Sequence, residues 1–158
     1  MKLSPLLVLV LLILVPARFT GAQQESKIKT LAQGLTVLVP EGVTMVRQKP
    51  AEDFDLMVFK KGTNAILRVY LGNQAEFPKE KTAGPIKKES INGLQTESVT
   101  EKQPNGTVSR EVLFRLRENG VWPQRMHGWY ARLSAKESAE ADEILSSVQL
   151  ADKRGGGK

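Results

Sequence analysis

Asn-Gly pairs recur at nearly equal intervals in the second half of this 158-residue chain, at Asn92-Gly93, Asn105-Gly106 and Asn119-Gly120. A type I′ turn needs two successive residues at positive φ, and Asn followed by Gly meets that need best. Regular turns of this kind between strand-like segments are typical of an antiparallel meander. The spacing therefore predicts a sheet built from consecutive antiparallel strands.

The segment between two of these turns carries the alternation that such a sheet requires. One parity of residues 107–118 is apolar with the exception of Arg110, at Val108, Val112, Phe114 and Leu116. The other parity is mostly polar, at Thr107, Ser109, Glu111, Arg115 and Arg117. A period of two places the first set on a core and the second in water.

Earlier strands are predicted as well. Leu35–Val39 is rich in β-branched residues and stops at Pro40, and the segments 56–59 and 65–71 flank a hairpin turn at Lys61–Asn64. The stretch 72–90 combines Pro and Gly with several lysines, which predicts a long exposed loop.

A single helix is predicted over 135–148. Ser134 and Glu137 form a capping box, and the apolar stripe consists of Ala141, Ile144, Leu145 and Val148. The predicted fold class is therefore α+β, an antiparallel β-meander sheet with a C-terminal helix packed on it.

Residues 1–22 have the order of a secretory signal peptide, with a base at Lys2, an apolar run at Leu6–Val15 and small residues up to Ala22. The run is too short to span a bilayer core. We expect cleavage after Ala22, with an uncleaved anchor as the alternative. The product is then a periplasmic or secreted protein without stable membrane insertion. It comprises a single domain over 23–151 and a disordered Gly-rich tail over 152–158.

Cysteine is absent from the chain, which excludes disulfides, thiolate catalysis and Cys-ligated metal sites. An exported domain without cysteine is ordinary in a bacterial periplasm, which is the source we favour. The net charge of +6 invites a nucleic-acid interpretation. Two of the bases, Lys2 and Arg18, fall in the signal segment and others in the tail, so we expect no nucleic acid as a partner.

Neither a metal nor a cofactor is predicted. The carboxylates of Glu52, Asp53 and Asp55 lack the spacing of a calcium loop, and we expect them to lie in a solvated turn before the strand at Leu56. Gly155-Gly156-Gly157 lies in the predicted tail, without the flanking strand and helix of a phosphate-binding loop. We expect no catalytic residue, no metal ligand and no cofactor-binding residue, and hence a protein that is not an enzyme.

The most specific surface candidate is the segment 122–130. It concentrates residue types that are enriched at binding hot spots, and we predict a partner surface formed by Trp122, Arg125, His127, Trp129 and Tyr130. In a regular strand Arg125, His127 and Trp129 face one way, and Met126 and Tyr130 the other. Core packing of these side chains is the competing interpretation.

Two other function classes stay open. His127 is the single histidine of the chain, and an envelope hydrolase or other enzyme could use it with a carboxylate as general base. A binder of anionic surfaces, either lipid or polyanion, could use the lysines at 79, 81, 87 and 88. A non-catalytic binding or accessory protein of the cell envelope, with another envelope protein as its partner, is the leading hypothesis.

The order of elements across about residues 33–150 resembles the PsbP-like superfamily. The segment Leu38–Val43, a strand end followed by Pro-Glu-Gly, is similar to the opening of these domains, and Ala141–Val148 is similar to their closing helix. The resemblance implies an α/β/α sandwich with a further helix, which would occupy 44–53. It also implies a non-catalytic accessory or binding role. No functional residue carries over, because no site motif of the family matches.

Overall fold

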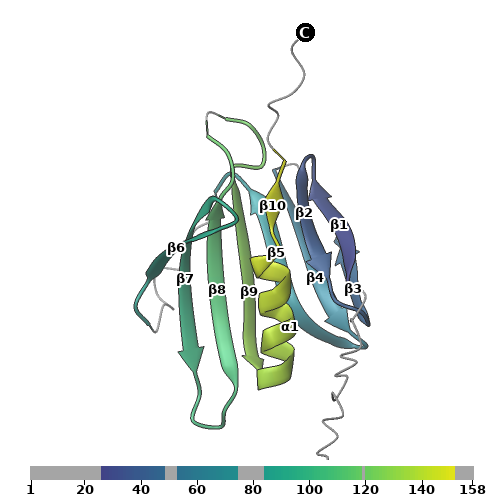
Figure 1. The fold of residues 1–158 in the computed structure, drawn as a ribbon, viewed down its shortest axis with the longest axis vertical. Coiled ribbons are helices and arrows are strands. Elements are labelled where there is room, and N and C mark those ends of the chain that lie inside the picture. The colour runs from purple at the N-terminus through teal and green to yellow at the C-terminus, as the bar shows by residue number, and fades with distance from the viewer. Residues whose placement is uncertain (1–25, 49–52, 75–83, 119, 152–158) are drawn as a thin grey trace, which may run out of the picture.

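The computed structural model describes residues 26–48, 53–74, 84–118 and 120–151. The expected signal segment, its cleavage site, the Asn119 position and the C-terminal tail lie outside these residues. The elements in the described ranges are β1 (Lys27–Ala32), β2 (Leu35–Val39), β3 (Val43–Arg47), β4 (Phe54–Lys61), β5 (Asn64–Gly72), β6 (Lys87–Ile91), β7 (Leu94–Lys102), β8 (Val108–Arg115), β9 (Arg125–Leu133), α1 (Ala135–Ser146) and β10 (Gln149–Leu150) (Figure 1).

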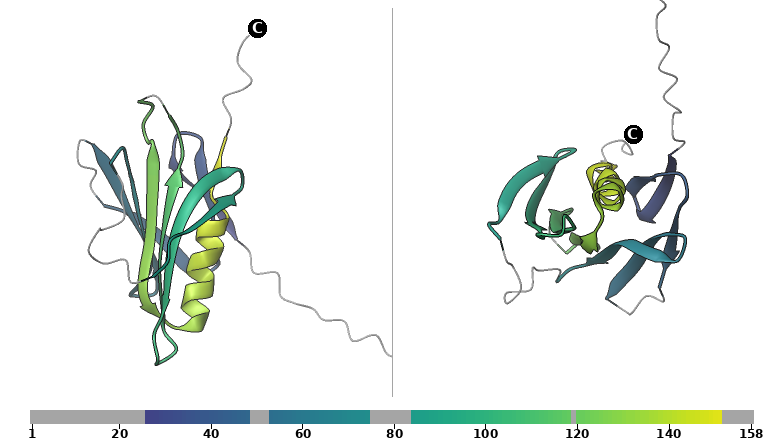
Figure 2. Two further views of the ribbon diagram at one scale, coloured as in Figure 1. Left: turned by 90° about the vertical axis from the view of Figure 1, so that its left-hand side faces the viewer. Right: turned by 90° about the horizontal axis from the view of Figure 1, so that it is seen from below.

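Two antiparallel sheets and one helix make up this described part of the chain. The larger sheet has seven strands in the order β3-β4-β5-β9-β8-β7-β6, and the smaller has three in the order β1-β2-β10. The larger sheet curves around α1, which lies in its concave side next to the smaller sheet (Figure 2). The structure is compatible with the predicted α+β class, because antiparallel strands carry a C-terminal helix packed on them. The predicted pairing of consecutive strands holds within β3-β4-β5 and within β6-β7-β8-β9, whereas β5 pairs with β9, and β1, β2 and β10 form a separate sheet.

The apolar core lies between the concave face of the large sheet, α1 and the small sheet. Phe59, Phe114 and Met126 come from the large sheet, Leu35 from the small sheet and Ile144 from α1, and each is at most 1% exposed. The predicted alternation in 107–118 is confirmed for its inner set, since Val112, Phe114 and Leu116 are buried. Because one continuous core joins all three layers, the position of each sheet depends on the helix between them.

The predicted capping box is present at the start of α1. The Glu137 amide donates to Ser134 Oγ at 3.3 Å, and the Ser134 amide donates to Glu137 Oε2 at 3.2 Å. The Ser134 hydroxyl also donates to Glu137 Oε2 at 2.7 Å, and this hydrogen bond, followed by the one from the Ser134 amide, lowers the pKa of the Glu137 carboxyl. The helix ends at Ser146, slightly before the predicted end at residue 148, because Ser147 has the φ and ψ of a C-cap.

The two described Asn-Gly turns differ from each other. Asn92 and Gly93 both have positive φ, as predicted for a type I′ turn, and Asn92 Nδ2 donates to the carbonyls of Ser146 and Val148 at the end of α1. At the second turn only Gly106 has positive φ, so the type I′ prediction is wrong there. Asn105 instead uses its Oδ1 as an acceptor, from the amide and the hydroxyl of Thr107.

Part of the predicted loop 72–90 is a strand. β6 lies at the edge of the large sheet and pairs with β7, and its Lys87 and Lys88 are exposed. Lysines on an edge strand discourage pairing with other chains. The strand was missed because its sequence lacks apolar alternation, and because Glu89 is held by ion pairs and not by an apolar core.

Two further expectations need correction. The resemblance implies a helix over 44–53, but Val43–Arg47 forms β3, which pairs with β4. Asp55, expected in a solvated cluster with Glu52 and Asp53, lies inside β4, is 7% exposed and pairs with Arg47 at 3.7 Å. Glu52 lies outside the described residues.

Arg110, the exception in the alternating strand, faces the concave side and joins α1 to the sheet. Its guanidinium donates to Asp142 Oδ1 on α1 and to Glu89 Oε1 on β6, each at 3.1 Å. Tyr130 donates to the same Asp142 oxygen at 3.1 Å. On the other flank of α1, Lys61 pairs with Glu140, which is 9% exposed. The acids of the helix therefore do more than cap and solubilise it.

Gly128 of β9 lies directly against Leu145 of α1. A Cβ atom built on it would lie 2.4 Å from Leu145 Cδ2, and Leu145 is itself 1% exposed. We predict that Gly128→Ala lowers the free energy of unfolding by about 1–3 kcal/mol, because extra volume in a filled core forces side chains out of place. Urea denaturation measures this. The added cost should be much smaller in a Leu145→Ala background, whereas strictly additive costs would contradict the packing assignment.

A second prediction concerns Arg110. Its replacement by Met leaves the carboxylates of Glu89 and Asp142 without their shared donor, so we expect a loss of about 2 kcal/mol or more in unfolding free energy. Arg115→Met on the same strand is the matched control. The Arg115 side chain is 64% exposed, and its replacement should cost less than about 1 kcal/mol. Equal losses in the two variants would contradict the structural role of Arg110.

Candidate partner-binding face

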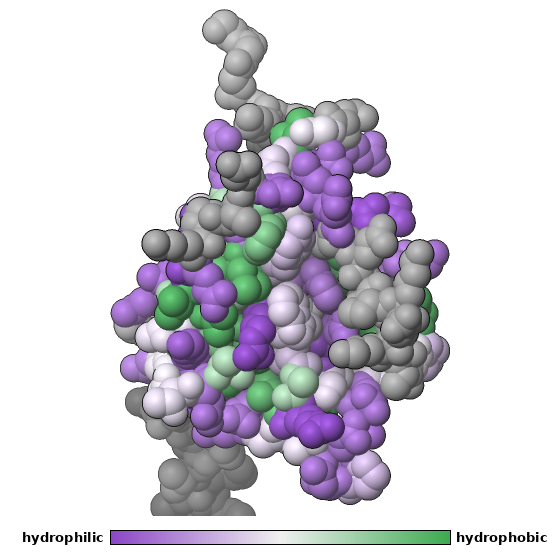
Figure 3. All heavy atoms as spheres, turned by 180° about the vertical axis from the view of Figure 1, so that it is seen from behind, coloured by the Kyte–Doolittle hydropathy of each residue, from purple (hydrophilic) through white to green (hydrophobic). Residues whose placement is uncertain are grey.

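Three of the five residues predicted as a partner surface lie on the outer face of β9. Arg125, His127 and Trp129 alternate along the strand with Met126 and Tyr130, which are 0% and 3% exposed and face the core. The predicted alternation of side chains between the two faces of this strand is therefore confirmed. Figure 3 views this outer side, where hydrophobic residues gather over β3 and β4.

Tyr130 does not belong to the predicted surface, and this part of the prediction is wrong. Its ring lies under α1, and its hydroxyl donates to Asp142. Burial, followed by the charge of Asp142, raises the pKa of the Tyr130 hydroxyl far above its usual value. The physical reason is the pleat of β9, which sends neighbouring side chains to opposite faces of the sheet.

Trp122 lies apart from the other members, in the loop between β8 and β9. It is 40% exposed and lines a depression of about 330 Å³ together with Val121, Leu150 and Ala151. The Trp122 carbonyl accepts a hydrogen bond from Arg117 Nη1 at 2.9 Å, and Arg117 also donates to the Gln33 carbonyl. Arg117 thus ties this loop to the turn between β1 and β2.

Each of the three outward-facing residues of β9 lies between one residue of β5 and one residue of β8. Trp129 lies opposite Arg68 of β5 and Glu111 of β8, His127 opposite Tyr70 and Leu113, and Arg125 opposite Gly72 and Arg115. We define the outer β9 face as this set: Arg68, Tyr70, Glu111, Leu113, Arg115, Arg125, His127 and Trp129.

Tyr70 gives the middle of this face a fixed shape. Its ring stacks on that of Phe54, with centroids 5.3 Å apart. A Cβ atom added to Gly72 would lie only 2.5 Å from the Tyr70 hydroxyl oxygen, which is closer than van der Waals contact allows. A side chain at position 72 would displace the ring. The glycine therefore allows the Tyr70 ring to lie along the strand toward Arg125.

His127 forms a pair with Glu111, with 3.1 Å between Nε2 and Oε2. Its ring lies 5.1 Å from that of Trp129, and its side chain is 13% exposed. Burial lowers the pKa of His127, and the charge of Glu111 opposes this shift without overcoming it. Burial therefore favours the neutral form of the imidazole.

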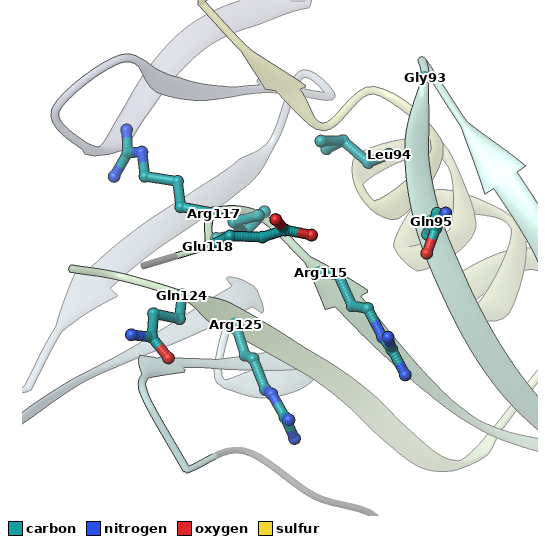
Figure 4. Close-up of a pocket in the computed structure, with 9 residues that line it drawn as sticks. Gly93, Leu94, Gln95, Arg115, Arg117, Glu118, Gln124 and Arg125 are labelled. Carbon is teal, nitrogen blue, oxygen red and sulfur yellow. The ribbon is translucent and has the colours of Figure 1, made fainter. Parts of the chain in front are cut away.

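A depression of about 450 Å³ opens at the end of the outer β9 face. Arg115 and Arg125 line it, together with Gln95, Glu118 and Gln124. Figure 4 shows Arg115 and Arg125 extending in the same direction from neighbouring strands, whereas Arg117 extends away from them. The alternation of residues 107–118 predicts that Arg115 lies on the outer side of its strand, but it does not connect Arg115 to Arg125. The register of β8 against β9 was needed for that connection, and no motif in the sequence carries it.

The catalytic alternative requires a cavity around His127 as well as an acid. Glu111 supplies the acid, but none of the three depressions described for this part of the chain is lined by His127. The described residues also contain no group of three or more His, Asp or Glu side chains arranged to hold a metal ion. Among those same residues, no helix has the length and apolar character needed to cross a membrane.

No protein-family model matches the sequence, and no curated protein matches it either.

The His127 pair predicts a pH dependence of stability. The folded pKa of His127 lies below its usual value near 6.5, so between these two values the unfolded chain binds more protons. The free energy of unfolding should therefore fall as the pH drops from 7.5 to 5.5. His127→Gln, which is neutral throughout, should flatten this part of the curve in urea denaturation. A slope unchanged by the substitution would contradict the assignment.

Proposed function

We propose that this chain is an exported, non-catalytic binding or accessory protein of the cell envelope, which contacts a partner protein through the outer β9 face. Export rests on the signal-peptide pattern of residues 1–22. The partner surface rests on one observation above all: Trp129, His127 and Arg125 stand in a row on the outer face of β9 beside an arginine-lined depression.

The composition of this row supports binding more than catalysis. Trp, Tyr and Arg are the residue types enriched at binding hot spots, because they combine large contact areas with directional polar groups. The titratable pair of His127 with Glu111 on this face has its imidazole largely buried. A general base that is shielded in this way has little access to a substrate proton.

We also propose that the fold is a variant of the PsbP-like sandwich. The closing helix α1 with its Ile144-Leu145 pair, followed by the short strand β10, supports this assignment. The variant differs at β3, which stands where the family has a helix. A non-catalytic accessory role is what the resemblance implies.

Capture of partners from the native envelope tests the proposed surface. We expect Trp129→Ala to lose the captured protein, because the substitution removes the largest apolar side chain of the row while leaving the core intact. Trp122→Ala is the matched control, since that side chain lies in the loop beyond the row. Both variants should unfold in urea as cooperatively as the wild type. Equal capture by the folded Trp129→Ala variant would remove the outer β9 face from consideration.

A further inference from the structure

We propose that Arg115 and Arg125 form a paired anion-recognition site for a carboxylate-bearing, acidic segment of a partner protein. This inference rests on the proposed binding function and names the chemistry of the partner. Its basis is the position of the two arginines within the register of the sheet.

Arg115 and Arg125 are directly opposite each other in the antiparallel pairing of β8 with β9. Side chains in this relation have Cβ atoms only about 5 Å apart, and like charges placed there destabilise a sheet. Two guanidinium groups thus extend from neighbouring strands into the lining of the depression of about 450 Å³. An anion seated between two guanidinium groups can accept two parallel hydrogen bonds from each.

The only ion pair described for the Arg115 guanidinium is a loose one. Its Nη2 lies 3.8 Å from Glu97 Oε1, which is beyond hydrogen-bond distance, and Glu97 lies equally far from Lys88 Nζ. The Arg115 side chain is 64% exposed. This guanidinium can therefore turn toward a ligand without breaking a close pair.

The remaining walls of the depression indicate which anion fits. Glu118 contributes a carboxylate to the lining, and Glu97 lies beside the neighbouring depression that Arg115 also lines. These acids repel a dense polyanion such as a nucleic acid or an anionic membrane, but they tolerate a single carboxylate held between the arginines. Gln95 and Gln124 offer amide groups to a peptide backbone, and Leu94 and Leu116 offer apolar contacts. The combination suits an acidic peptide segment with apolar neighbours.

Fluorescence anisotropy with two labelled octapeptides tests this proposal. One peptide alternates Glu with Leu, and the other replaces each Glu by Gln. We expect the Glu peptide to bind and the Gln peptide to bind at least about tenfold more weakly. Arg115→Gln and Arg125→Gln should each weaken binding of the Glu peptide by about tenfold, whereas Arg132→Gln, at the far end of β9, should leave it unchanged.

Lysine variants distinguish recognition by the paired hydrogen bonds of a guanidinium group from attraction to a positive charge alone. Arg115→Lys and Arg125→Lys retain the charge but lose the planar geometry, so both should bind the Glu peptide more weakly than the wild type. Thermal unfolding should show that the Arg→Gln variants remain folded, because neither arginine side chain is buried in the core. This readout distinguishes a lost ligand contact from a lost fold.

Several outcomes would overturn the inference. These are equal binding of the two peptides, insensitivity of Glu-peptide binding to both Arg→Gln variants, and lysine variants that bind like the wild type. Inorganic phosphate or phosphatidylglycerol vesicles that bind with the same dependence on Arg115 and Arg125 would also overturn it, since the acidic protein segment would then be the wrong ligand. The proposed function is tested separately: partner capture that depends on Trp129 but not on the arginines would retain it and remove this inference.

Discussion

The pairing of β9 with β5 on one side and β8 on the other is the interaction on which the rest of the structure depends. It joins two meanders, β3-β4-β5 and β6-β7-β8, into one curved sheet. The same register puts Gly128 under α1, so that the helix can approach the sheet closely enough to fill the core. It also aligns Arg125 with Arg115 and His127 with Tyr70 on the outer side. A shift of the β9 register by one residue would exchange the two faces of the strand. It would remove both the packing site of α1 at Gly128 and the outer β9 face.

Polar contacts fix how α1 lies in the trough that this pairing creates. Lys61 of β4 holds one flank through Glu140, and Arg110 of β8 holds the other through Asp142. Partly buried ion pairs of this kind contribute little net stability compared with apolar side chains of the same size, because the charges lose their hydration. Their effect here is on the orientation of the helix. An apolar stripe alone would allow α1 to rotate about its axis or to shift along it, whereas two charged contacts on opposite flanks favour a single position.

Local signals in the sequence predicted much of the fold, and long-range pairings account for what was missed. The capping box of Ser134 and the period-two alternation of 107–118 depend on near neighbours, so they could be recognised directly. β6 escaped prediction because Glu89 is held by Arg110, which lies in a distant part of the sequence. The outer row of β9 was predicted in its alternation, but Tyr130 could be assigned to the core only once α1 was placed. The Arg115–Arg125 pair follows from strand register alone, and composition gave no hint of it.

The two described Asn-Gly turns look alike in the sequence but have opposite hydrogen-bonding chemistry. Asn92 uses its amide nitrogen as a donor to two carbonyls at the end of α1, whereas Asn105 uses its amide oxygen as an acceptor from Thr107. Deamidation, to which Asn-Gly sequences are prone, replaces the amide with a carboxylate that accepts but does not donate. At Asn105 the acceptor would survive this change. At Asn92 the new charge would face two carbonyl oxygens and release the end of the helix from the β6–β7 hairpin, so deamidation of this turn would remove a link between α1 and the edge of the large sheet.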